Sequence, residues 1–239
     1  MVRVVLLAFL VALFSMSCAQ GSVGKSPELS PEGMLEQAHR ALLELEYCKF
    51  ALSHSGDGTE LFPGVTLSRI EGYLEFPDKS EFLVSAQLGS MLLETSVVMG
   101  NERAFMTDFF SGQWQEIPSD SLPIDVLYFR EALSAILVSL DEVELQSDST
   151  EESDLVTING TTNSSVLSDL LSGALPDDTV DAKVVLQKRT HMLSQITLTG
   201  KLVDTDGLDM VRTLTLDYIC LLYTSDAADE RSSVDLGGR

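Results

Sequence analysis

The side chains that most often carry chemistry are few and scattered in this sequence. The cysteines are Cys18, Cys48 and Cys220, and the histidines are His39, His54 and His191. No CxxC, HExxH, GxSxG or P-loop spacing connects them, so the sequence predicts no metal site, no cofactor and no catalytic residues. Carboxylates are abundant and two could meet in space. They concentrate in expected turns and on polar strand faces, where a solvated charge is ordinary, and we therefore expect a protein that is not an enzyme.

The charge of the chain narrows the choice of partner. Lys and Arg number 15 against 37 Asp and Glu, which gives a net charge of −22. Such a surface repels nucleic acid and anionic lipid headgroups, which excludes binding through a basic patch. An acidic surface also keeps an exported protein soluble and separate, so we expect a monomer that does not bind nucleic acid.

The N-terminus has the pattern of an export signal. Arg3 is followed by an unbroken apolar run over residues 4–14. As a helix this run would rise about 16 Å, roughly half the thickness of the bilayer core. The run therefore predicts the apolar region of a signal peptide rather than a membrane span.

Cys18 is the one cysteine whose neighbours predict a reaction. Ser17 directly before it matches the motif in which bacterial lipoproteins are cleaved and acylated on cysteine, although Ser15 stands where leucine is usual. We expect Cys18 to carry a lipid anchor that holds the protein on the extracytoplasmic face of the cell membrane. The alternative is ordinary cleavage near Ala19-Gln20, which would discard Cys18.

The remaining boundaries follow from composition. Residues 20–31 are rich in Gly, Ser and Pro, as in a flexible tether. Residues 220–239 resemble the translation of a sequencing adapter, so we expect the natural sequence to stop near Ile219. Only Cys48 then remains, and the domain forms no internal disulfide. The expected organisation is a signal peptide at 1–17, a lipidated cysteine and tether at 18–31, a single domain at 32–219 and a non-native tail at 220–239.

Hydrophobic periodicity predicts a helix, a long meander, a helical insertion and more meander. The first helix begins at Ser30-Pro31-Glu32, with a capping residue followed by proline, and ends near Glu46. Further helices are expected at 129–140 and 166–171. Alternating strands are expected at 47–54, 69–76, 82–88, 93–99, 103–107, 114–117, 155–159, 182–187, 192–201 and 210–218, with one more within 142–154. The predicted class is α+β, a large curved antiparallel sheet with helices gathered on one face.

A series of short landmarks then runs in order through residues 34–218. They are Ala38 and Ala41-Leu42-Leu43, Phe62-Pro-Gly64, Gly72-Tyr-Leu-Glu-Phe-Pro-Asp-Lys79, Gly112-Gln-Trp-Gln-Glu-Ile-Pro118, Val156-Thr-Ile-Asn-Gly160, the helix 166–171 with Gly173-Ala-Leu-Pro176, and the strand pair at 182–201. In this collinear set the chain resembles the LppX/LprA/LprF/LprG family of lipoproteins, known best from mycobacteria. The sharpest landmark is Gly-x-Trp-x-x-Ile-Pro, whose ordinary structural role would be a buried Trp114 at a sheet edge.

The resemblance implies a half-barrel of antiparallel strands wrapped around helices, like the LolA and LolB lipoprotein carriers. It also implies a function: binding acylated lipid or glycolipid in an apolar cavity and carrying it across the cell envelope, with a membrane transporter as a further partner. The alternative is an envelope module of the same fold that binds a partner protein and carries no lipid.

Alternation along the expected strands and helices selects the side chains that would line such a cavity. They are Phe50, Leu52, Ile70, Leu74, Phe82, Val84, Ala86, Leu133, Leu137, Leu167 and Leu171. The same pattern suits an ordinary packed core. An apolar cavity above about 1,000 Å³ would exceed the usual small-ligand pocket and fit acyl chains.

Overall fold

The structure is a computed structural model that describes residues 29–56, 59–101, 103–118, 128–146, 153–168, 170 and 173–218. The chain divides into two compact units, Met1–Ser30 and Pro31–Arg239, and the fold below is that of the second. The predicted signal peptide, the predicted lipidation site Cys18 and the tail 220–239 lie outside the described residues.

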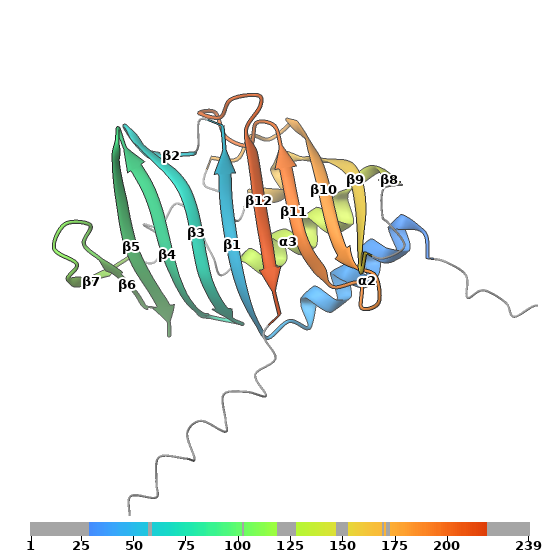
Figure 1. Ribbon diagram of the computed structural model, residues 1–239, viewed down its shortest axis with the longest axis horizontal. Helices are drawn as coiled ribbons and strands as arrows, with labels where there is room; N and C mark the ends of the chain where they lie inside the picture. Colours follow the sequence, from blue (N-terminus) through green and yellow to red (C-terminus); the bar gives the residue numbers. More distant parts are fainter. Residues whose placement is uncertain are drawn as a thin grey trace, which may run out of the picture. The chain divides into compact units, whose positions relative to one another are not determined.

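One antiparallel sheet forms most of the fold. Within the described residues it has 12 strands, in the order β7-β6-β5-β4-β3-β1-β12-β11-β10-β9-β8, and β2 pairs with β3 off this path (Figure 1). The strands are β1 Tyr47–Ser55, β2 Thr59–Phe62, β3 Val65–Glu75, β4 Lys79–Leu88, β5 Met91–Gly100, β6 Arg103–Thr107, β7 Trp114–Ile117, β8 Asp141–Leu145, β9 Leu155–Asn163, β10 Thr179–Gln187, β11 Leu193–Thr199 and β12 Val211–Asp217.

The centre of the sheet joins the two ends of the domain. β1, the first strand of the chain, pairs on one side with β3 and on the other with β12, the last strand. Elsewhere in the sheet each strand pairs with the strand that precedes or follows it in the chain, as the tight turns in the sequence predict. The register shifts between Leu67 and Arg69 in the β3–β4 pair and between Val185 and Leu186 in the β10–β11 pair. Such irregularities increase local bending and twist, which suits a curved sheet.

The helices cover one face of this sheet, which we call the inner face. Helix α2 spans Pro31–Leu43, α3 spans Phe129–Ser139, and the 3-10 helix η3 spans Ser164–Leu167. In Figure 1, α2 and α3 lie across the sheet behind β9–β12. Proline at the first position and Glu32 in the first turn favour the start of α2. The α+β prediction, with an antiparallel sheet and helices packed on one face, is confirmed.

The main deviation from the predicted elements is a short extra strand. β2 follows the predicted turn at 55–58 and pairs with β3 from Thr59 to Phe62. Its four residues are too few to show alternation, so the sequence carried no periodic signal for it. No helix in the described part of the chain has both the length and the apolar character needed to cross a bilayer.

Candidate functional site

The inner face of the sheet is built from alternate residues of each strand. In β3 the burial alternates on either side of the irregularity between Leu67 and Arg69, with Leu67, Ile70 and Leu74 buried. In β10, Val180, Ala182, Val184 and Leu186 are buried in the same two-residue rhythm. Because successive side chains of a strand point to opposite faces, this rhythm gives one apolar face and one polar face.

The side chains that the sequence predicts to line a cavity lie in this apolar layer. Phe50, Ile70, Leu74, Phe82, Leu133, Leu137 and Leu167 belong to one large buried cluster, with Leu52 and Val84 half-buried against it. Ala86 is also buried, but in a smaller neighbouring cluster with Val65 and Leu93. Leu171 lies outside the described residues. The structure therefore brings nine of these predicted residues together and places Ala86 beside them.

A glycine organises the aromatic part of this layer. Gly72 of β3 stands opposite Phe50 of β1 and opposite Phe82 of β4. The backbone of Glu81 and Phe82 occupies the space that a Cβ on Gly72 would need. The two phenylalanine rings meet edge to face with their centroids 6.4 Å apart. A larger residue at position 72 would separate β3 from β4, which explains why glycine suits this position.

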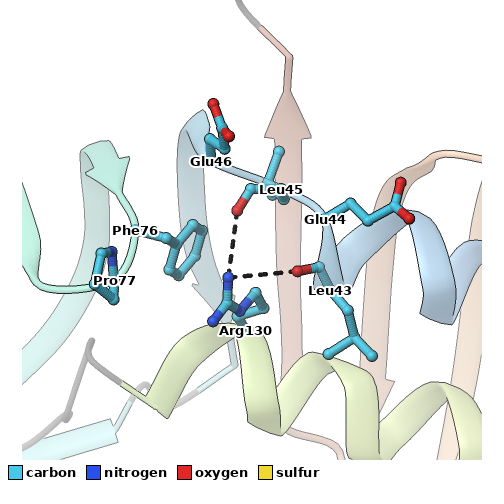
Figure 2. Close-up of a pocket in the computed structure, with 7 residues that line it drawn as sticks. All are labelled: Leu43, Glu44, Leu45, Glu46, Phe76, Pro77 and Arg130. Carbon is cyan, nitrogen blue, oxygen red and sulfur yellow. Dashed lines mark hydrogen bonds between the residues drawn. The ribbon is translucent and has the colours of Figure 1, made fainter.

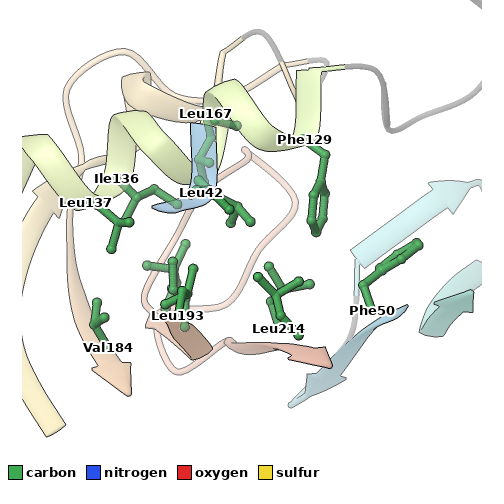
Figure 3. Close-up of a cluster of buried hydrophobic side chains, with 14 of the residues drawn as sticks. Leu42, Phe50, Phe129, Ile136, Leu137, Leu167, Val184, Leu193 and Leu214 are labelled. Atoms are coloured by element: carbon green, nitrogen blue, oxygen red, sulfur yellow. The ribbon is translucent and has the colours of Figure 1, made fainter. Parts of the chain in front are cut away.

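The helices supply the opposite wall of the layer. Figure 3 shows Leu137 of α3 pointing toward Val184 of β10, and Phe129 pointing from the start of α3 toward Phe50. The rings of Phe129 and Phe50 have centroids 5.2 Å apart. Helices and sheet thus share one interior, formed mainly by leucine, isoleucine, valine and phenylalanine side chains.

Two polar contacts hold α3 in place, one to the other helix and one to the sheet. Ser134 of α3 and His39 Nδ1 of α2 are joined by a hydrogen bond of 2.7 Å, which links the two helices. Ser139 of α3 and Thr162 of β9 are joined by a hydrogen bond of the same length between their hydroxyl oxygens. The serine–histidine pair resembles part of a hydrolase triad, but Ser134 is only 7 % exposed between the helices, so its hydroxyl has a structural role.

A pocket opens at one edge of this interior, where α2 ends. Its volume is about 380 Å³, and its walls are Leu43, Glu44, Leu45, Glu46, Phe76, Pro77 and Arg130 (Figure 2). This is near the lower end of the volumes usual for small-ligand pockets and well below the roughly 1,000 Å³ expected for acyl chains. The turn that forms one wall contains a cis peptide bond between Phe76 and Pro77.

Arg130 is the charged group of this pocket. Its Nη1 donates to the carbonyl oxygens of Leu43 and Leu45 at 3.5 and 3.4 Å. Its guanidinium also lies 4.8 Å from the centre of the Phe76 ring and 3.4 Å from the Glu131 carboxylate. The carbonyl groups at the end of a helix carry negative partial charge, so an arginine at this place complements the end of α2.

The interior also contains apolar side chains that the sequence analysis did not select. Val156, Ile158, Val180, Val184, Leu186, Leu193, Ile196 and Leu214 lie in the same buried cluster, as do Leu35, Ala38 and Leu42 of α2. Their signal was present in the sequence, since the first helix and the strands at 155–159, 182–187, 192–201 and 210–218 are all predicted from hydrophobic periodicity. Alternation alone does not predict which strand face packs against which helix.

Two further sequence features have a definite outcome. Cys48 is a free, buried thiol, and burial raises its pKa to about 12, so it is not a nucleophile. Trp114 is 54 % exposed on the edge strand β7, which corrects the expectation of a buried tryptophan at this landmark. The correction follows from the position of β7, a four-residue strand at the end of the strand order whose side chains are mostly exposed. Among the described residues no group of His, Cys, Asp and Glu is placed to hold a metal ion.

Comparison with known proteins adds evidence from structure alone. No family of known sequences and no curated protein matches the chain. Several solved structures do, among them two mycobacterial lipoproteins. LprF from Mycobacterium bovis matches with a TM-score of 0.56 and 11 % identity, over 78 % of this chain and 91 % of that one. The lipoprotein LppX from Mycobacterium tuberculosis matches with a TM-score of 0.51 and 15 % identity, over 78 % of this chain and 93 % of that one. The resemblance predicted from the landmarks is thus confirmed at the level of structure: the chain has the fold of LprF and LppX.

Proposed function

We propose that this protein is a membrane-tethered, extracytoplasmic lipoprotein that binds acylated lipid or glycolipid between its sheet and its helices and carries it across the cell envelope. The observation that supports the proposal most directly is the continuous apolar layer between α2, α3 and the inner face, in a fold shared with the lipoprotein LppX. No catalysis is part of the proposal.

Apolar contact alone can hold an acyl chain in such a layer. Each methylene group that leaves water for an apolar environment contributes about 0.8 kcal/mol, so an acyl chain binds strongly without a dedicated polar site. The layer offers leucine, isoleucine, valine and phenylalanine side chains from two sheet halves and two helices. Such a surface selects for chain length and shape rather than for a particular headgroup.

The packing of the interior implies how a chain would enter. The predicted lining residues are buried against one another, and the pocket at the edge has a volume of only about 380 Å³. For the described part of the chain, we infer that a long acyl chain enters by parting the helices from the sheet. The Ser139–Thr162 hydrogen bond connects α3 to β9. Parting at this contact exposes two hydroxyl groups that water can hydrogen-bond, so no polar group is left without a partner.

A lipid anchor would fit this role. Lipidation of Cys18 would keep the carrier beside the bilayer that supplies or receives its cargo, with residues 20–31 as the tether. A single short acyl chain binds membranes only marginally, so the multiple acyl groups typical of bacterial lipoproteins suit stable tethering.

The first test is native mass spectrometry of the protein purified from bacterial membranes. We expect adducts whose masses correspond to acyl lipids, released by organic extraction. A protein that is lipid-free, and that also fails to take up lipid from vesicles, would contradict the proposal. Recovery of one stoichiometric protein partner by that lipid-free protein would favour the alternative of an envelope interaction module.

The second test addresses the route of entry. The double variant Ser139→Cys/Thr162→Cys replaces two oxygens that lie 2.7 Å apart with a pair of thiols. Once oxidised, this disulfide would hold α3 against β9. We expect the oxidised protein to lose uptake of lipid from vesicles and the same protein after reduction to regain it. The reduced form is the matched control, since it has the same composition; equal uptake in both forms would show that α3 does not part from β9.

A further inference from the structure

A polar pair of side chains interrupts the apolar inner face at the far end of β1. His54 of β1 and Arg212 of β12 stand directly opposite each other in the antiparallel ladder. Residues opposite each other on neighbouring strands point to the same face. This is the inner face, because His54 follows Phe50 and Leu52 at two-residue steps and Arg212 precedes Leu214 in the same way.

Arg212 is firmly fixed there. Its Nη2 donates to Asp206 Oδ1 at 2.5 Å and to Thr59 Oγ1 at 2.8 Å. Asp206 is held in turn by the backbone N–H groups of Leu202 and Val203, which donate to its Oδ2 at 2.8 and 3.0 Å. The side chains of Arg212 and Asp206 are 7 % and 0 % exposed. The pair is therefore a rigid, dry group rather than a surface ion pair.

Two nitrogens of this group lack a protein partner. Arg212 Nη1 and His54 Nδ1 are both buried and form no hydrogen bond with the described residues. Buried polar groups in native proteins nearly always have a partner, so two adjacent ones without a partner indicate a place for an added acceptor. Arg212 is more than nine-tenths buried, so the acceptor reaches it through the protein interior rather than from bulk water.

The charge of the group decides what that acceptor is. Asp206 balances the charge of Arg212, and burial lowers the pKa of His54 to about 4, aided by Arg212 and opposed by Asp206. At neutral pH the group is therefore uncharged overall. A carboxylate or phosphate would add an uncompensated buried charge, whereas a neutral carbonyl oxygen would accept from the guanidinium without that cost.

The geometry points to a subsite in which Arg212 Nη1 and His54 Nδ1 hold the ester carbonyl group of a neutral acyl lipid. This inference rests on the proposed function, because it assigns a polar group of the same cargo. The apolar layer takes the chain, and the His54–Arg212 pair takes the first polar atoms that follow it. In the Nδ1–H tautomer the histidine donates as well, so both nitrogens can donate to the oxygen atoms of the ester group.

The test compares three probes of equal chain length on the full chain. Methyl palmitate carries the ester, palmitate the carboxylate and hexadecane neither, and each is measured by displacement of a pyrene-labelled alkane at pH 7. We expect the wild type to bind the ester about tenfold or more tightly than the alkane, the effect of one hydrogen bond to a charged group. We expect palmitate to bind less tightly than the ester.

The variants remove the subsite without leaving a buried charge. Arg212→Met/Asp206→Asn removes both charges but keeps an oxygen for the backbone N–H groups of Leu202 and Val203. His54→Phe removes the second nitrogen. Each should lower ester affinity about tenfold and leave alkane affinity unchanged. The control is Arg69→Met, which removes an exposed arginine paired with Glu71 on neighbouring β3 and should change neither affinity.

Three outcomes would overturn the inference, and they are distinguishable. Equal loss of ester and alkane binding in the variants would show a merely structural role. A preference for palmitate that disappears in the same variants would assign the subsite to a carboxylate. Equal binding of ester and alkane by the wild type would mean that ordered water, not the lipid, hydrogen-bonds the two nitrogens. The proposed apolar site would then still stand. Failure of the wild type to bind any probe would instead contradict the proposed function itself.

Discussion

The two ends of strand β1 each hold an arginine beside the apolar interior, and the two arginines are treated very differently. Arg212, near Ser55, is buried with Asp206 and uses one terminal nitrogen for two hydrogen bonds. Arg130, near Tyr47, has a side chain 23 % exposed and forms longer bonds to two carbonyl oxygens and to Glu131. The same functional group is thus part of the core at one end and part of a wet edge at the other.

The comparison teaches that burial, more than the number of bonds, sets the energetic weight of a charge. A buried ion pair contributes little net stability over an apolar substitute, yet removing one partner is costly because the other charge remains buried. At a partly exposed site water replaces the lost partner, so the cost is small. The loss in the free energy of unfolding should therefore differ between the two ends when one arginine is replaced. The difference should shrink when the arginine and its carboxylate partner are replaced together.

The largest effect is expected at the buried end. Arg212→Met leaves the Asp206 carboxylate buried without its counter-charge, and we expect a loss of about 3–5 kcal/mol in the free energy of unfolding. Urea denaturation followed by circular dichroism measures it. The double variant Arg212→Met/Asp206→Asn should recover much of the loss; a single variant within 1 kcal/mol of the wild type would break the comparison.

The next effect is the pH dependence of the same end. The pKa of His54 is lowered from 6.5 to about 4, so the unfolded chain binds its proton more readily than the folded one. Stability from this group is complete above pH 6.5 and falls as the pH drops from about 6.5 to about 4, by up to about 3 kcal/mol. Urea denaturation across that window measures it. In His54→Phe this component should vanish, so the wild type should lose up to about 3 kcal/mol relative to the variant between pH 6.5 and pH 4; parallel curves would refute it.

A smaller effect is expected at the exposed end. Arg130→Met keeps an aliphatic side chain beside Phe76 but removes two long hydrogen bonds to carbonyl oxygens, and we expect a loss of about 1 kcal/mol. Arg130 Nε is buried without a partner in the described residues, which lowers the net value of this arginine further. Denaturation at fixed pH measures the change. A loss as large as that of Arg212→Met would mean that the pocket edge behaves as core.

Sequence reasoning predicted the apolar layer but not these two ends. Phe50, Ile70 and Leu74 follow from two-residue alternation, since one face of an antiparallel sheet must be covered. The burial of Arg212 does not follow from alternation. Its partner Asp206 comes from a loop, and His54, which lies opposite Arg212 in the sheet, is 158 positions away in the sequence. From sequence alone a charged residue is predicted to face solvent. Only the pairing of β1 with β12 shows that Arg212 faces the interior.

The exposed Trp114 shows the opposite error. A tryptophan in a Gly-x-Trp-x-x-Ile-Pro landmark suggests a buried ring, but β7 is the last strand of the sheet on its side. The order of the strands in the sheet depends on tertiary pairing, which a local sequence motif does not encode. A side chain on an edge strand can therefore be exposed even when it is a tryptophan. Conversely, the helix at 129–140 was predicted almost to the residue, because its apolar stripe is a local signal.

The smallest effect is expected for an arginine pair with good geometry and no burial. Arg103 on β6 and Glu116 on the edge strand β7 form two hydrogen bonds, of 2.8 and 3.0 Å, while both side chains are more than half exposed. The bonds raise the pKa of Arg103 and lower the pKa of Glu116. We expect Glu116→Gln to lower the melting temperature least of the three sites, and the difference to disappear in 1 M salt, where the screening length is about 3 Å. Because this bidentate pair has the best geometry of the three, a melting temperature as low as that of Arg212→Met would show that geometry rather than burial controls the weight of each arginine.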